Sequence, residues 1–140
     1  MATRMNAWFG DERTKLAEGK VFEAERLERR GAFAVARARW GEAAELFSKV
    51  AISVAADHPN TRADLGIAAV ACFARSLRFD LAVEFAERLL AEPDGLSPGG
   101  KLELEQMVAE YARRQPAARL PTRRATRMRD RVRTELRAEA

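Results

Sequence analysis

The sequence predicts an all-α protein made of antiparallel helical hairpins. Of its 140 residues, 47% are hydrophobic, which is a globular composition in a chain long enough for one modest core. Alanine is abundant and β-branched residues are few, a balance that favours helix over strand. Apolar residues recur at spacings of three and four, and all five prolines follow residue 58, where they separate the helical segments.

The first half of the chain is expected to form two helices. Asp11 is a suitable N-cap for the first, which should run over residues 11–37. A tight break at 38–41 and a second helix over 41–56 should follow, with a loop at 57–60. The second helix is assigned because one face carries apolar residues at helical spacing, namely Ala43, Leu46, Phe47 and Val50.

A third helix is expected over residues 62–76. Thr61, followed three positions later by Asp64, resembles a capping box that would start it. The run from Ile67 to Ala74 is nearly all apolar, so this helix should be the most buried element.

Two further helices should complete a domain over residues 1–115. A short turn leads to a fourth helix over 81–91. The fifth should begin with Ser97 as N-cap and Pro98 as its first residue, and reach Arg114. Residues buried between the packed helices are expected to include Trp40, Ala43, Phe47, Phe73, Phe79, Ala82 and Leu89.

The C-terminal segment, residues 116–140, differs in composition from the rest. Residues 113–140 carry 10 Arg and 3 acids, a net charge of +7, whereas residues 1–112 carry 15 basic and 18 acidic side chains, a net charge of −3. Two prolines form a linker, after which a sixth helix should carry a narrow apolar stripe flanked by Arg. Its expected contacts with a partner or an anionic surface are Arg123, Arg127, Met128, Arg131, Val132 and Leu136.

Two segments of the domain are similar to each other. Residues 39–50 align without gaps to residues 78–89, an offset of 39. Trp40 falls opposite Phe79, and Ala43 falls opposite Ala82. Leu27 and Gly31, a large residue and a small one four positions later, stand in the preceding helix.

These residues resemble the tetratricopeptide repeat family of helical hairpins. In that family an aromatic residue opens the second helix of a hairpin, as Trp40 and Phe79 would here, and small residues allow the helices to cross closely. The resemblance covers residues 24–113 and implies a short α–α superhelix of stacked hairpins followed by an extra C-terminal helix. The period exceeds the family's usual length of about 34 residues, and an ordinary antiparallel helical bundle stays open as an alternative.

The resemblance also implies a concave surface that binds a peptide. By helical phase, its residues here would be Glu25, Glu28, Val35, Ile67, Ala71, Arg75, Glu105 and Arg113. The family's clamp for C-terminal carboxylates uses Lys and Asn, and neither type stands at these positions. The expected ligand is therefore an amphipathic helix or an extended segment.

The sequence offers no catalytic pattern. One cysteine and one histidine do not make a zinc site, and Gly99-Gly100 lacks the spacing of a phosphate-binding loop. Acidic residues alternate with Arg at helical spacing, as solvated helix faces do. We therefore expect neither enzymatic activity nor a cofactor or metal.

These observations favour a protein–protein interaction adaptor or chaperone-like scaffold. Nucleic-acid or anionic-surface binding through the Arg-rich segment is one alternative, weakened by the absence of aromatic residues there, and a self-associating subunit is another. The single cysteine and the absence of an N-terminal apolar run or membrane span lead us to expect a cytoplasmic location. Arg outnumbers Lys along the whole chain, a composition typical of bacterial genomes rich in G and C.

Overall fold

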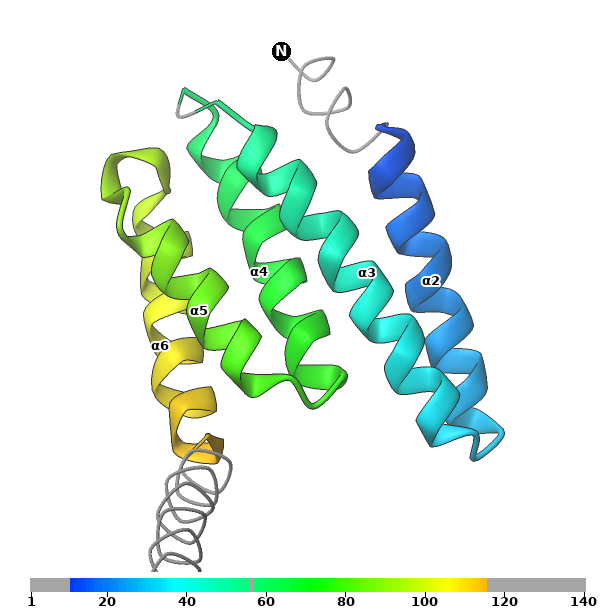
Figure 1. Cartoon of the computed structure of the whole chain (residues 1–140). Coiled ribbons are helices and arrows are strands. Elements are labelled where there is room, and N and C mark those ends of the chain that lie inside the picture. The colour runs from blue at the N-terminus through cyan, green and yellow to red at the C-terminus, as the bar shows by residue number, and fades with distance from the viewer. Residues whose placement is uncertain (1–10, 56, 116–140) are drawn as a thin grey trace, which may run out of the picture.

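The computed structural model describes residues 11–55 and 57–115, and within them the fold is all-α (Figure 1). Five α-helices follow one another, and a short 3-10 turn, η1 (Pro93–Gly95), joins the last two. The helices are α2 (Glu12–Arg29), α3 (Phe33–Ser53), α4 (Pro59–Arg75), α5 (Phe79–Leu90) and α6 (Pro98–Arg114). The predicted sixth helix lies outside the described residues.

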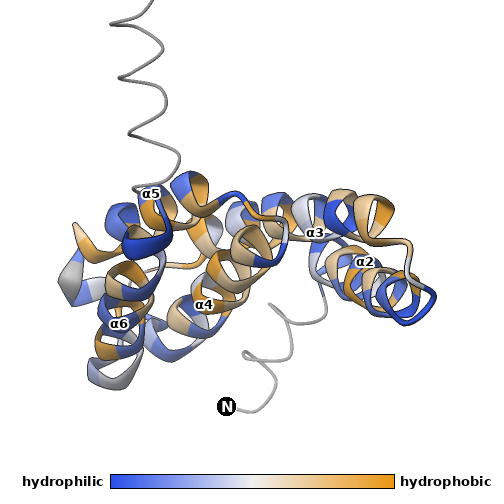
Figure 2. Ribbon diagram, turned by 90° about the horizontal axis from the view of Figure 1, so that it is seen from below, coloured by the Kyte–Doolittle hydropathy of each residue, from blue (hydrophilic) through white to orange (hydrophobic). Residues whose placement is uncertain are grey.

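The helices form two layers, with α2, α4 and α6 in one and α3 and α5 in the other (Figures 1 and 2). Each helix packs against the next along the chain, and α4 also packs against α6. Within the described part of the chain, α2 has extensive contacts only with α3. Within their layer, α2 and α4 therefore do not pack closely against each other.

Two turns of the same kind end α2 and α4. Gly31 has φ +78°, and the Gly31 and Ala32 amides donate to the carbonyls of Glu28 and Leu27, which is a Schellman motif. Leu77 has φ 64° and closes α4 with the same pair of bonds. The prediction of one helix over 11–37 is therefore wrong, because a left-handed residue at Gly31 ends α2 and the chain reverses before Phe33.

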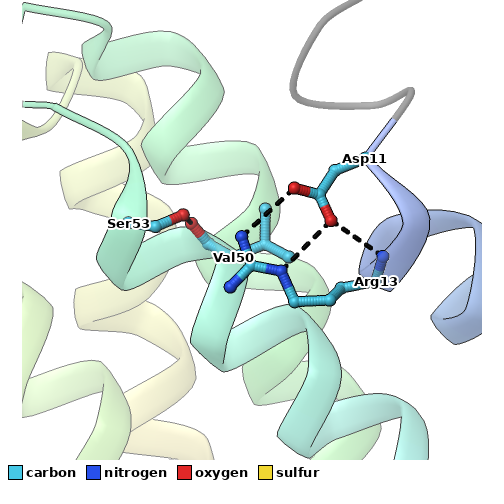
Figure 3. A network of polar contacts seen from close by, with 4 residues as sticks. All are labelled: Asp11, Arg13, Val50 and Ser53. Atoms are coloured by element: carbon cyan, nitrogen blue, oxygen red, sulfur yellow. Dashed lines mark hydrogen bonds and ion pairs between the residues drawn. The ribbon is translucent and has the colours of Figure 1, made fainter.

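Side-chain caps predicted at two helix starts are confirmed. The Asp11 carboxylate accepts a hydrogen bond of 2.8 Å from the Arg13 amide and also pairs with the Arg13 guanidinium (Figure 3). The Ser97 hydroxyl accepts a bond of 3.2 Å from the Gly100 amide, with Pro98 as the first residue of α6. At the end of α3, the Ser53 hydroxyl donates to the Val50 carbonyl.

The predicted start of the third helix is wrong by three residues. Pro59 is the first residue of α4 and His58 is its N-cap. Proline suits this position because its fixed φ is helical and its missing N–H would have no partner inside the helix. Thr61 is 3% exposed and lies within the helix, so it forms no capping box with Asp64.

The core is centred on α4, which buries more residues than any other described helix, as its apolar run predicts. The residues expected to be buried are so, except Phe79, which is half-buried at the start of α5 with its ring 5.8 Å from that of Tyr111. Small residues allow close helix approach: a Cβ placed on Gly100 of α6 would collide with the Cβ of Ala63 on α4.

The register of the predicted repeat is also wrong. Trp40 lies in the interior of α3, whereas Phe79 is the first residue of α5. The turns at Gly31 and Leu77 place the two hairpins 46 residues apart, and Phe33, not Trp40, is the counterpart of Phe79. The two offsets, 46 and 39, differ by seven residues, or about two helical turns, so the same face recurs and an apolar pattern fits both.

Candidate binding groove

A cavity of about 380 Å³ lies between α2 and α4, with α3 as its floor. It exists because both helices pack on α3 without extensive contact with each other, while the far side of α4 is covered by α6. We call this cavity and its walls the α2/α4 groove. Its lining residues are Glu18, Val21 and Phe22 of α2, Trp40 and Phe47 of α3, and Ala68, Ala71, Cys72 and Arg75 of α4.

The walls of the groove are mainly apolar. Phe22 is 67% exposed, the largest exposed fraction among the large hydrophobic residues described. Ala68 and Ala71 on the opposite wall are half-buried, and their short side chains leave space in front of the floor. An aromatic ring that stays in water beside an apolar cavity indicates a surface that another molecule can cover.

A polar cluster joins the three helices at one end of the groove. The Trp40 indole N–H donates to Glu28 Oε1 at 2.6 Å. The Arg75 guanidinium lies 5.0 Å from the centre of the Trp40 ring, and its Nη1 is 3.8 Å from Glu28 Oε2. The side chains of Arg75 and Glu28 are 59% and 32% exposed, so their attraction is weakened by solvent. This cluster connects α2 to α4 across the floor that Trp40 forms.

Cys72 provides the only thiol of the chain, and it lies on the wall of the groove. It is 5% exposed, and burial raises the pKa of the thiol to about 12, although the nearby Arg75 charge acts in the opposite direction. The thiolate is the nucleophilic form of cysteine, so this side chain is a weak nucleophile at neutral pH.

The structure brings some of the predicted groove residues together and separates others. Ala71 and Arg75 line the α2/α4 groove, Glu28 belongs to the polar cluster, and Ile67 packs against the core. The other four predicted residues are exposed and do not line the groove: Glu25, Val35, Glu105 and Arg113. Val35 was assigned to the wrong helix, because α3 begins at Phe33.

Sequence reasoning missed the wall that α2 contributes. Glu18, Val21 and Phe22 stand at positions i, i+3 and i+4, so they share one face of α2. That spacing was the available signal. The same spacing also fits a buried face, because phenylalanine usually packs in the core, whereas Phe22 projects into solvent.

Other predicted contacts and sites fall outside this groove. The predicted contacts at Arg123, Arg127, Met128, Arg131, Val132 and Leu136 lie outside the described residues. Over residues 11–55 and 57–115, no three His, Cys, Asp or Glu side chains gather so that they could hold a metal ion. Of the helices described, none combines the length and the apolar character needed to cross a membrane.

The arrangement thus offers an open, apolar groove with charged residues at its edges. Comparison with known proteins adds no family to this description: no protein-family model, no curated protein and no solved structure matches the chain.

Proposed function

We propose that this chain is a protein–protein interaction adaptor or chaperone-like scaffold that binds an amphipathic segment of another protein in the α2/α4 groove. The observation that carries the proposal is Phe22, which is 67% exposed beside a cavity floored by Trp40 and Phe47. Helix-in-groove recognition uses this kind of surface, in which an apolar face of the ligand replaces water along the groove.

The lining favours binding over catalysis. Its ionisable side chains are Glu18, Cys72 and Arg75, and the thiol has a raised pKa that opposes nucleophilic attack. The remaining lining residues are apolar, so a ligand gains free energy mainly by removing apolar surface from water. This supports a macromolecular segment as the ligand.

Charges at the edges would orient such a segment. Glu18 lies toward the start of α2, whereas Arg75 is the last residue of α4, and both helices run antiparallel to α3. A ligand with a basic residue near Glu18 and an acidic residue near Arg75 would complement both charges. Edge charges contribute more to orientation and association rate than to affinity.

Two exposed phenylalanines provide a matched test of the groove. Phe22→Glu places a charge on the groove wall, whereas Phe33→Glu makes the same change at a residue that is 58% exposed and does not line the groove. Full-length chains would be used for affinity capture from the native host, and thermal unfolding would confirm that both variants fold. We expect partners to be lost with Phe22→Glu and kept with Phe33→Glu. An identical set of partners for both variants and the parent would contradict the proposal.

Arg75→Glu tests the charged edge of the same groove. This change removes the cation near Glu28 and reverses the charge offered to the ligand. We expect weaker capture of the partners that Phe22→Glu removes, with salt dependence reduced. If Arg75→Glu captured the same partners as the parent, the partners would not contact this edge of the groove.

A tetratricopeptide-like superhelix belongs to the same proposal. It is supported by the two layers and by the equivalent turns at Gly31 and Leu77, although the matched aromatic residues differ from those that the sequence suggested. Binding of nucleic acid or of a second copy through residues 116–140 stays an alternative. The described residues carry 16 basic and 18 acidic side chains, a net charge of −2, and so give phosphates no general attraction.

A further inference from the structure

The residues before α2 carry an apolar pattern that suits the α2/α4 groove. Met1, Met5, Trp8 and Phe9 stand at positions i, i+4, i+7 and i+8, which is the spacing of one helical face. Gly10 and Asp11 follow, and a glycine before an N-cap allows the chain to reverse there. This segment lies outside the described residues, and it is covalently attached to one wall of the groove.

The lengths agree as well. In helical form ten residues span about 15 Å, at a rise of about 1.5 Å per residue. The same rise carries α2 about 15 Å from Glu12 to Phe22, the last lining residue on that helix. A segment that reverses at Gly10 and runs back along α2 in helical form would therefore lie beside the part of α2 that lines the groove.

We propose that residues 1–10 occupy the α2/α4 groove of their own chain through Met1, Met5, Trp8 and Phe9, so that a partner segment must displace them. The docking itself stands on the groove and the apolar pattern. The displacement rests in addition on the proposed function.

Charge and tethering support this occupant over the alternatives. Residues 1–10 carry one cation, Arg4, and no acid, while the wall that they would approach carries Glu18. A short tether raises the effective concentration of a segment at its site to the millimolar range, so even a weak apolar contact is occupied. The Arg-rich segment follows α6, which packs on the side of α4 that faces away from the groove (Figure 2).

Nuclear Overhauser contacts in the full-length chain would test the docking directly. We expect contacts from the Trp8 ring to the Phe47 ring and the Ala68 methyl group. A sample that mixes isotope-labelled and unlabelled chains would separate contacts within one chain from contacts between copies. Contacts only between copies, or contacts to these residues from Met128 or Val132 in place of Trp8, would overturn the proposal in favour of those occupants.

The single thiol supplies a second readout in the full-length chain. Cys72 lies on the groove wall, so a cover over the groove should slow its modification by a maleimide. Trp8→Ala with Phe9→Ala should raise the rate about tenfold if the segment covers the groove nine-tenths of the time. Thr3→Ala with Asn6→Ala, on the opposite face of the pattern, should leave the rate unchanged. Equal rates for the two double variants would overturn the proposal.

The two proposals can fail separately. Loss of partners with Phe22→Glu tests whether the groove binds a partner. The Overhauser contacts and the rate of thiol modification test the docking of residues 1–10, and both are measured without a partner. If the segment competes with partners, Trp8→Ala with Phe9→Ala should capture more of the partners that Phe22→Glu loses. Unchanged capture together with positive Overhauser contacts would overturn the displacement and keep the docking.

Discussion

Gly100→Ala should destabilise the fold because Gly100 lies where α6 crosses α4. The added Cβ would collide with the Cβ of Ala63 and would lie 2.8 Å from the Ser97 hydroxyl oxygen. Ala63 is 1% exposed, and its methyl group has no rotamer that could move away. One of the two helices must therefore shift. Gly99→Ala is the matched control, because a Cβ on Gly99 meets nothing within 4 Å.

The expected magnitude follows from two opposing effects. Alanine is favoured over glycine within a helix by up to about 1 kcal/mol, and this gain applies to both variants. Overpacking costs about 1–3 kcal/mol and applies only to Gly100→Ala. Displacement of Ser97 would also weaken the N-cap bond to the Gly100 amide, which is worth about 1 kcal/mol. Gly100→Ala should therefore be less stable than Gly99→Ala by about 2–4 kcal/mol.

Thermal unfolding followed by circular dichroism measures this difference. For a domain of this size, 1 kcal/mol corresponds to roughly 4 °C in the melting temperature. The two variants should therefore melt about 8–16 °C apart, with Gly99→Ala equal to or above the parent. If Gly100→Ala melted as high as Gly99→Ala, α4 and α6 would not cross at this point. The conclusion that α6 packs on the α4 wall of the groove would then be wrong.

Three further predictions concern the turns, the core and the thiol. Gly31→Ala should lower stability by about 1 kcal/mol, and Leu77→Gly should raise it by a similar amount, since both positions have positive φ. Leu77 is 56% exposed, so its replacement removes little packing. Urea unfolding would show opposite shifts of the midpoint for the two variants. Ala82→Leu should lower stability by about 1–3 kcal/mol, because Ala82 is fully buried, and parental melting would show that α5 is not packed there. The unfolding free energy of the parent should fall between about pH 9 and pH 12, because the pKa of the Cys72 thiol is near 9 in the unfolded chain but near 12 in the folded one. Cys72→Ala should lose this part of the pH dependence. Identical pH profiles for the parent and Cys72→Ala would contradict the raised pKa.

Local chemistry explains which parts of the fold the sequence could predict. Asp11 and Ser97 were placed as N-caps because a cap depends only on a side chain and the amides two or three residues later. The burial of α4 followed from an apolar run that leaves no face for water.

Other parts depend on tertiary structure. Gly31 was interpreted as a small residue at a helix crossing, since nothing local distinguishes that role from a left-handed turn. Leu77 gave no signal, because leucine avoids positive φ and adopts it here only where packing of α4 and α5 fixes the turn.

The candidate site was predicted only in part for a similar reason. Ala71 and Arg75 were identified from helical phase, which is local to α4. The groove itself depends on the distance between α2 and α4, and that distance depends on how both pack on α3. The spacing of Glu18, Val21 and Phe22 indicates one helical face, but only the exposure of Phe22 distinguishes a groove wall from a buried face.

The polar cluster at one end of the groove has a mechanical consequence. Among the described residues, Glu28 and Arg75 form the ion pair that bridges α2 and α4, and it lies at the end of the groove where α4 terminates. The two walls are therefore linked to each other directly at this end, whereas elsewhere each is held through its packing on α3. Because salt screens such an exposed pair over about 8–10 Å, raising the ionic strength should weaken this link between the two walls.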